Sequence, residues 1–314
     1  MLAILILLFV KAQTAPEIVW NQDGSWGAYT IEATSQVTGR SSGYGSDVSL
    51  YAISRDRKTT IHLFTGEYPH LTKSSTISEE YVYPSIVRWA PHGVHVLFFK
   101  GHFERSASID ASGSPLFDVS VVTGEIRKLS KSFARPDGYA EDRIIYDQSI
   151  AFSPDGKQLL LVMGSGKHSI SNKRIALFDY SSLEKTWLTT PDYSCFAPSW
   201  SPDGRQIVFS ANPEELPAVD PAKGDIYQEL PALYMSQRIW IMNTDGTGKR
   251  LLSHPDKQAH YPKWVTNGQI QFLREPERGV LREVWEIRVD GTDERFIKTI
   301  EARESNLWRY DVPG

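Results

Sequence analysis

A short motif recurs five times along this chain: an aromatic residue followed, three and four residues later, by a turn-forming pair that ends in glycine. We call the aromatic residue the anchor of its repeat. Successive anchors are 69, 63, 48 and 64 residues apart, and a recurrence of this kind is the signature of a repeat architecture. The copies are Trp20-Asn21-Gln22-Asp23-Gly24, Trp89-Ala90-Pro91-His92-Gly93, Phe152-Ser153-Pro154-Asp155-Gly156, Trp200-Ser201-Pro202-Asp203-Gly204 and Trp264-Val265-Thr266-Asn267-Gly268.

Short apolar stretches flank each motif, as Ala197–Trp200 and Gln206–Phe209 do around the fourth turn. Apolar runs of four to six residues on either side of Pro, Asp and Gly indicate two strands joined by a tight hairpin. Glycine suits the end of such a turn because it reaches positive φ at little cost. We therefore expect Gly24, Gly93, Gly156, Gly204 and Gly268 to close the five turns.

A second hairpin follows in each repeat. In the fourth it consists of Ile239–Met242, the turn Asp245-Gly246-Thr247 and a renewed apolar pair at Leu251 and Leu252. Each repeat therefore predicts four antiparallel strands, and residues 16–314 contain no convincing amphipathic stretch of helical period. The sequence predicts an all-β protein.

Four-stranded units repeated around an axis form a β-propeller, in which each unit is a blade and only short sheet edges remain. Inner strands of blades are covered on both faces and are apolar throughout. We expect Trp89, Trp200 and Trp264 to belong to the core between blades. The sequence thus predicts one propeller domain over residues 16–314, with five countable repeats and a partial sixth.

The repeats at Phe152 and Trp200, each followed by an apolar run, resemble those of TolB-like propellers, as does Ile239-Trp240-Ile241-Met242-Asn243-Thr244-Asp245-Gly246-Thr247. The resemblance covers roughly residues 17–300. It implies a six-bladed propeller in an extracytoplasmic protein, usually a non-enzymatic interaction platform. The similar propellers of the prolyl oligopeptidase group carry a hydrolase domain, which is not recognised in this sequence.

The number of blades stays open at this point. The tail Leu307-Trp308-Arg309-Tyr310-Asp311 fits the start of a sixth repeat, and it also fits a strand that pairs with the N-terminal blade and closes the ring. A ring of five blades and an incomplete ring of six are both compatible with the count.

The N-terminal residues Met1–Val10 form an almost unbroken apolar run, followed by Lys11 and small residues. Ten helical residues span about 15 Å, whereas a membrane span needs roughly 20 residues. The run has the length of a signal-peptide core, so we expect residues 1–15 to be a leader and the protein to be exported to the periplasm or the cell exterior. The alternatives are an inner strand and an N-terminal membrane tether.

Composition excludes some functions. A net charge of −4 offers no basic footprint for nucleic acid, and we expect no nucleic-acid partner, no stable transmembrane span and a monomer. The single cysteine, Cys195, excludes an intrachain disulfide and is expected to be a small buried apolar residue.

The long connections should all lie at one end of the ring. In an up-and-down blade, the loops between second and third strands and the crossings between blades share one end, and loops carry binding on a rigid scaffold. These connections are 33–47, 100–114, 164–172, 212–237 and 274–283 within repeats, and 65–82, 130–145, 190–195, 253–260 and 298–305 between them. The candidate binding residues on this long-loop face are His102, Phe103, Arg105, His168, Tyr227, Tyr234, His254, His260 and Tyr261.

The longest insertion, Asn212–Gln237, contains four prolines, four acidic residues, Tyr227 and Tyr234. A loop of this length is usually either functional or disordered. Our hypothesis is that it arches over the mouth of the central channel together with Lys100–Ser114.

Catalytic and metal motifs are not recognised. The eight histidines are scattered, although His254 and His260 bracket one inter-repeat loop, and we predict no metal and no cofactor. The segment Gly164–Ser169 lacks the spacing of a phosphate loop, and there is no Gly-x-Ser-x-Gly elbow. Asp23, Asp155 and Asp203 are expected to accept hydrogen bonds from backbone amides of their own turns.

These observations favour a non-catalytic, exported propeller that binds an unidentified protein, peptide or envelope glycan through its long-loop face. The alternative is an enzyme that acts on a polysaccharide or a peptide at the mouth of the central channel. Convergent His, Asp and Glu side chains in the mouth would favour the enzyme.

Overall fold

The part of the chain that the structure describes folds into five four-stranded antiparallel sheets. The computed structural model describes residues 18–37, 43–66, 84–100, 116–129, 150–163, 173–190, 194–212, 236–275 and 281–301, and these residues contain no helix. In every sheet the strands follow their order in the sequence. The prediction of an all-β fold of four-stranded repeats is confirmed.

Each sheet forms one blade, and the blades are numbered here in chain order. Blade one contains β1 (Val19–Trp20), β2 (Trp26–Val37), β3 (Gly43–Ser54) and β4 (Thr60–Gly66). Blade two contains β5 (Pro84–Trp89), β6 (His95–Lys100), β7 (Leu116–Ser120) and β8 (Ile126–Lys128). Blade three contains β9 (Ile150–Phe152), β10 (Gln158–Met163), β11 (Arg174–Asp179) and β12 (Lys185–Trp187). Blade four contains β13 (Cys195–Trp200), β14 (Gln206–Ala211), β15 (Arg238–Asn243) and β16 (Arg250–Leu251), and blade five contains β17 (His260–Thr266), β18 (Gln269–Arg274), β19 (Leu281–Arg288) and β20 (Arg295–Glu301).

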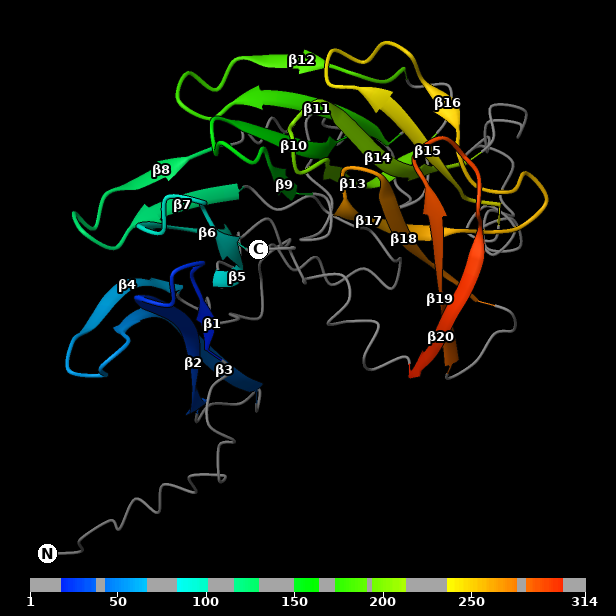
Figure 1. Ribbon diagram of the computed structural model, residues 1–314. Helices are drawn as coiled ribbons and strands as arrows, with labels where there is room; N and C mark the ends of the chain where they lie inside the picture. Colours follow the sequence, from blue (N-terminus) through cyan, green and yellow to red (C-terminus); the bar gives the residue numbers. More distant parts are fainter. Residues whose placement is uncertain are drawn as a thin grey trace, which may run out of the picture.

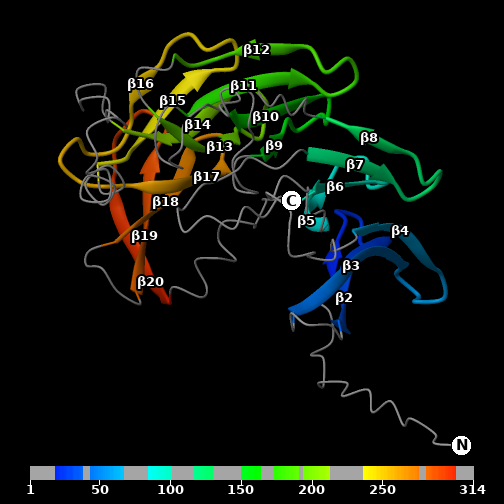
Figure 2. The same ribbon diagram turned by 180° about the vertical axis from the view of Figure 1, so that it is seen from behind.

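The blades follow one another along an arc, with their first strands toward the centre and their fourth strands outside (Figure 1). The view from behind shows the same order, with blades one and five at the two ends of the arc (Figure 2). This radial arrangement is that of a β-propeller.

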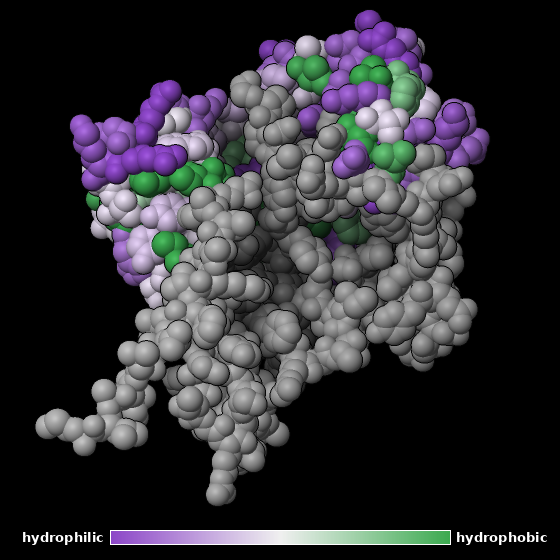
Figure 3. Space-filling view, turned by 90° about the horizontal axis from the view of Figure 1, so that it is seen from below, coloured by the Kyte–Doolittle hydropathy of each residue, from purple (hydrophilic) through white to green (hydrophobic). Residues whose placement is uncertain are grey.

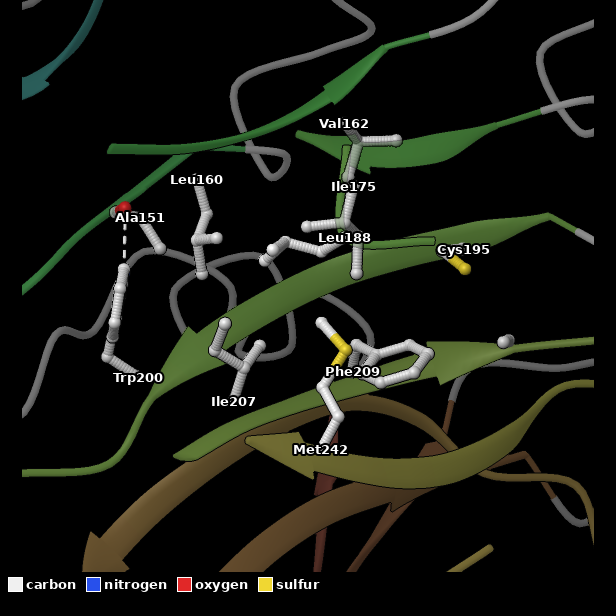
Figure 4. Packing of buried hydrophobic residues seen from close by; sticks show 11 residues of the cluster. Ala151, Leu160, Val162, Ile175, Leu188, Cys195, Trp200, Ile207, Phe209 and Met242 are labelled. Carbon is white, nitrogen blue, oxygen red and sulfur yellow. Dashed lines mark hydrogen bonds between the residues drawn. The ribbon is translucent and has the colours of Figure 1, made fainter. Parts of the chain in front are cut away.

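The core lies between the blades. Four clusters of buried apolar side chains each join two successive blades. Between blades three and four, Leu160, Val162 and Ile175 face Trp200 and Phe209 (Figure 4). Burying a side chain of this size contributes about 1.5–3 kcal/mol, so face-to-face packing of blades is the main source of stability.

A hydrogen bond recurs at three of these contacts. In each, the indole Nε1–H of an anchor donates to a main-chain carbonyl of the preceding blade. The pairs are Trp89 to Val19 at 2.7 Å, Trp200 to Ala151 at 3.1 Å (dashed in Figure 4) and Trp264 to Ser199 at 3.1 Å. Each accepting carbonyl belongs to the residue immediately before the anchor of its own blade, so the same hydrogen bond recurs at equivalent positions of successive blades. The anchor of blade three is Phe152, whose phenyl side chain has no N–H to donate.

The anchors differ in burial. Trp89, Trp200 and Trp264 are buried at 8%, 7% and 1% exposure, whereas Trp20 is 39% exposed. Trp20 belongs to blade one, at the end of the arc. None of the four clusters packs another blade against the face of blade one on which Trp20 lies.

The first turn of four blades follows the sequence prediction. Gly24, Gly93, Gly156 and Gly204 have φ between +67° and +71°. Gly268 also ends its turn, but the expected positive φ is absent there, because only residues 267 and 268 separate β17 from β18, with a register shift between Trp264 and Thr266, whereas five residues separate the first two strands of every other blade.

The turn aspartates also behave as predicted. The carboxylates of Asp23, Asp155 and Asp203 each accept a hydrogen bond from the backbone N–H two residues later, at 2.8–3.1 Å. Hydrogen bonds from the Ser153 and Ser201 hydroxyls, together with these backbone bonds, lower the pKa of Asp155 and Asp203.

Two predicted connections are shorter than expected. The segment predicted as a loop from residue 33 to residue 47 is mostly strand, because β2 and β3 are 12 residues each and pair from Trp26 with Ser54 to Val37 with Gly43. β20 likewise continues to Glu301, into the predicted loop 298–305. Polar residues that pair regularly give no apolar run from which a strand can be predicted.

No helix among the residues described here has the length and apolar character needed to cross a membrane. Residues 1–17 and 302–314 lie outside the described residues, so the leader, the extent of the domain and the partial sixth repeat remain predictions.

Candidate functional site

Three of the nine candidate binding residues lie in the described part of the chain: His254, His260 and Tyr261. His254 and His260 belong to the contact between blades four and five, whereas Tyr261 packs against Leu273, Val284 and Ile300 on the opposite face of blade five. The other six, His102, Phe103, Arg105, His168, Tyr227 and Tyr234, lie outside the described residues, which Figure 3 draws in grey. The hypothesis of a loop arching over the channel mouth falls on the same undescribed segments.

Buried polar side chains gather at the strand ends of this face. We call them the polar rim, and each immediately precedes, begins, ends or immediately follows a strand of blades three, four or five where a long connection starts or finishes. The rim comprises Lys173, Ser194, Asn212, Gln237, His260, Arg274 and Glu275, all at most 8% exposed. Burying charged and amide groups is costly unless they are paired, so their partners define what the rim can do.

His260 is the centre of a hydrogen-bonded chain between the two blades. Its Nδ1 is 2.9 Å from Gln237 Oε1 at the start of β15, and its Nε2 is 2.9 Å from Gln258 Oε1. The Gln258 amide donates in turn to the main-chain carbonyl of Glu275. His260 is 1% exposed, so this imidazole is fixed in place and joins blade four to blade five.

Arg274 is a buried cation with incomplete pairing. Its Nη2 donates to Glu294 Oε1 at 2.7 Å and its Nε to the Gln258 carbonyl at 3.1 Å. Its guanidinium lies 4.3 Å from the centre of the Trp285 ring, a cation–π contact. Nη1 is buried and has no hydrogen-bond partner among the residues that the structure describes, which leaves donors of a charged group unsatisfied there.

A second arginine lies close by. Arg238 begins β15, and its Nη1 donates to the Gln237 carbonyl at 2.9 Å. Burial lowers the pKa of Arg238, nearby Arg274 lowers it further, and Asp256 opposes the change. Two guanidinium groups therefore lie near each other at this end of the contact between blades four and five, with the carboxylates of Glu294 and Asp256 beside them.

Asn212, which follows β14, adds an unsatisfied acceptor to the rim. Its backbone N–H donates to the Ser194 carbonyl at 3.1 Å. Its side-chain Oδ1 is buried, and no described residue forms a hydrogen bond with it. The rim therefore holds an unsatisfied donor on blade five and an unsatisfied acceptor on blade four.

The inner strands of blades four and five carry a matching irregularity beside the rim. Ala197 and Tyr261, each three residues before its anchor, have φ of +46° and +50°, and the ladder shifts register there. A left-handed non-glycine residue costs of order 1–3 kcal/mol, and such bulges commonly re-aim side chains beside functional sites. Proline follows each of them, at Pro198 and Pro262, and this shared Pro is the sequence signal that could have predicted the bulges.

The described residues give little support for a metal site or for a nucleophilic cysteine. They contain no group of three or more His, Cys, Asp and Glu side chains that could hold a metal ion. Cys195 is fully buried, as predicted, and burial raises the pKa of its thiol to about 12. A thiol of that pKa is protonated at neutral pH and is not a nucleophile.

Comparison with solved structures shows similarity of fold at low sequence identity. A puromycin-hydrolyzing peptidase from Mycobacterium tuberculosis has a TM-score of 0.55 and 10% identity over 89% of this chain and 37% of the peptidase. An oligogalacturonate lyase in complex with manganese has a TM-score of 0.54 and 12% identity over 90% of this chain and 64% of the lyase. This chain spans less than two thirds of each. A structure assigned to TolB from Agrobacterium tumefaciens aligns over 91% of this chain and 81% of that chain, with 16% identity and a TM-score of 0.48.

Sequence comparison adds one short match. A dipeptidyl-peptidase 5 from Porphyromonas endodontalis is 30% identical over 103 residues, which are 32% of this chain and 13% of the peptidase. No family model matches the chain. The fold therefore defines the chain as a β-propeller protein, and the function has to be argued from its own residues.

Proposed function

We propose that this protein is a non-catalytic, exported β-propeller that binds a protein, a peptide or an envelope glycan through its long-loop face. The observation that carries the proposal is the pair of unsatisfied buried groups in the polar rim, Arg274 Nη1 and Asn212 Oδ1. A buried polar group without a partner costs about 1–3 kcal/mol, so its presence calls for an explanation. A partner that supplies the missing hydrogen bonds would provide one.

The surroundings of the rim support this proposal. Arg238 and Arg274 favour a ligand with carboxylate, carbonyl or hydroxyl oxygens on that side. The rim side chains project from strands of a packed scaffold and so are held in fixed positions, and the longest connection of the chain, residues 212–237, joins two of these strands. Fixed polar groups beneath long loops are a common arrangement for recognition.

The test compares the two faces of the propeller. The full chain is applied to arrays of peptides and of envelope oligosaccharides, and the tightest ligand is titrated against three variants. Deletion of residues 214–232 and the pair His254→Ala with Lys257→Ala alter the long-loop face. Lys58→Ala with Lys157→Ala alters exposed residues in the short turns of the opposite face and serves as the control.

We expect the two long-loop variants to weaken binding at least about tenfold, equivalent to about 1.4 kcal/mol, and the control to bind like the unaltered chain. Unchanged binding by both long-loop variants, or loss of binding by the control alone, would contradict the proposal.

The second candidate is an enzyme that acts on a polysaccharide or a peptide. Two findings favour it: the short match to a dipeptidyl-peptidase and the fold shared with a lyase and a peptidase. The discriminating assay incubates the full chain with oligogalacturonate and with chromogenic dipeptides, with and without Mn²⁺. Turnover that is lost on deletion of residues 214–232 would replace the binding proposal.

Export is part of the same proposal and is tested separately. The mature protein is recovered from the envelope fraction of its own cells and its N-terminus is sequenced. We expect a start after the apolar run, near residue 16. A protein that keeps Met1 and stays in the cytoplasm would exclude the leader.

A further inference from the structure

The outer face of blade five is built like a contact surface between blades. Leu273, Val284 and Ile300 form a buried cluster with the partly buried Tyr261, and every member belongs to blade five. The other clusters each join two blades. Blade five is the last in the chain, so among the described residues no later blade covers this cluster.

An ion pair on the same face of blade five also indicates a contact surface between blades. The residue that precedes each anchor starts a row of paired residues across its blade. In blade five the row from Lys263 runs through Gln271 to Glu286 and Arg295, whose side chains pair at 2.7 Å. Glu286 is 8% exposed.

Blade two has an equivalent pair of an acidic residue and an arginine on the third and fourth strands of its row. There the row from Arg88 runs through Leu97 to Asp118 and Arg127, which pair at 3.0 Å. Blade three covers this pair, and its Tyr180 hydroxyl donates to Asp118 at 2.6 Å. By this equivalence, the Glu286–Arg295 pair lies where a following blade would pack.

The spacing of the last three rows along the chain indicates which segment covers this face. The crossings after blades one and two are longer, so that Trp89 comes 28 residues after Ile61 and Phe152 comes 25 residues after Arg127. In blade three the row ends at Thr186, and the next anchor, Trp200, comes 14 residues later. In blade four it ends at Arg250, and Trp264 also comes 14 residues later. In blade five it ends at Arg295, and Trp308 comes 13 residues later.

The residues around Trp308 extend the match. Asp311 follows Trp308 by three positions, as Asp23, Asp155 and Asp203 follow their anchors, although Val312 stands where the five motifs have glycine. Those three aspartates all accept a backbone N–H in the first turn of a blade.

We propose that Trp308 is a sixth anchor and that residues 302–314 pack on the outer face of blade five as the inner strand of a sixth blade position. The indoles of Trp89, Trp200 and Trp264 each donate to the carbonyl of the residue just before the preceding anchor. By the same rule the Trp308 indole donates to the Lys263 carbonyl, since Lys263 immediately precedes Trp264. The segment covers the cluster of Leu273, Val284 and Ile300. The inference is independent of the proposed function.

The first test compares two substitutions in the tail of the full chain. Trp308→Ala removes the proposed anchor. Tyr310→Ala, two residues later, is the matched control, because four of the five equivalent residues, Gln22, Pro154, Pro202 and Thr266, are exposed and the fifth, Pro91, is half-buried. We expect Trp308→Ala to lower the midpoint of thermal unfolding by roughly 5 °C or more and Tyr310→Ala to leave it nearly unchanged. Equal effects of the two substitutions would overturn the proposal.

The second test does not depend on the stability of a variant. The unaltered chain is labelled with 5-fluorotryptophan, and the ¹⁹F signals of Trp20, Trp264 and Trp308 are assigned with single Phe substitutions. We expect the signal of Trp308 to show a small H₂O/D₂O solvent shift, like that of buried Trp264. A shift as large as that of Trp20, which is 39% exposed, would contradict the assignment.

The same sample distinguishes another occupant of the face. Light scattering should give the mass of one chain for the unaltered protein. A dimer that Trp308→Ala dissociates would show that the segment packs on a second copy, and would also overturn the proposal.

Discussion

The hydrogen bonds that the anchor indoles donate to the preceding blade contribute to the stability of the whole arc. Trp264→Phe removes the donor to the Ser199 carbonyl, while Phe152 shows that a phenyl ring is accepted at an anchor position. The carbonyl loses its partner, so we expect the free energy of unfolding to fall by about 1–3 kcal/mol in urea titrations.

Trp20→Phe is the control for that substitution. Trp20 is 39% exposed, and we expect a change within about 0.5 kcal/mol. Equal losses for Trp20→Phe and Trp264→Phe would show that the hydrogen bond between blades contributes nothing.

A second prediction at the residue scale concerns acid. The Asp179 carboxylate accepts hydrogen bonds from the Ser182 and Ser181 backbone N–H groups and from the Ser181 hydroxyl, and these bonds lower its pKa from 3.8 to about 2. A lowered pKa adds stability that is present in full above the unfolded value and is lost as pH falls. Between pH 4 and pH 2, Asp179→Asn should therefore lose less stability than the unaltered chain. Parallel pH profiles of the unfolding free energy for the two chains would refute this.

At the scale of elements, the first turn of each blade depends on its glycine. Gly204 has φ of +69°, where a side chain strains the backbone, although the nearest atom that an added Cβ would meet is an ordinary 3.7 Å away. We expect Gly204→Ala to cost about 1–2 kcal/mol. Gly268→Ala is the matched control, because Gly268 has no positive φ, and thermal unfolding should register a smaller loss for it. The reverse order would contradict this account of the turns.

Elements were predictable from the sequence where local chemistry repeats. Anchors such as Trp200, turn glycines such as Gly204 and turn aspartates such as Asp203 act within a few residues, so their pattern predicts the strands and hairpins. The ends of β2 and β3 were missed because their pairing from residue 32 to residue 37 has no apolar run to mark it.

The candidate site could be predicted only in part. His260 was predicted from its place in an inter-repeat connection, but its partner Gln237 lies 23 residues away on another blade. Arg274 was missed entirely, because its importance follows from the contact with Glu294 and from its unpaired Nη1, which depend on how the blade twists and packs. Contacts between elements leave no local signal in one sequence.

On the scale of the whole molecule, the contact between blades two and three includes a polar link. The Tyr180 hydroxyl of blade three donates to the Asp118 carboxylate of blade two, which also pairs with Arg127. Burial and the hydrogen bond to Asp118 raise the pKa of Tyr180, so its hydroxyl stays protonated and donates at neutral pH.

A double-mutant cycle measures this link. Asp118→Asn, Tyr180→Phe and the double variant are unfolded in urea, and we expect a coupling energy of about 1–3 kcal/mol because Asp118 is 1% exposed. Strict additivity of the two substitutions would mean that the blades are not joined through this pair.

The central claim is that successive four-stranded sheets pack face to face as blades, each held to its predecessor by an anchor. The most direct measurement is hydrogen exchange of the tryptophan indole N–H groups in the ¹⁵N-labelled chain. The account predicts slow exchange for Trp89, Trp200 and Trp264, whose indoles donate to the preceding blade, and fast exchange for the exposed Trp20. Exchange of Trp200 and Trp264 as fast as that of Trp20 would contradict it.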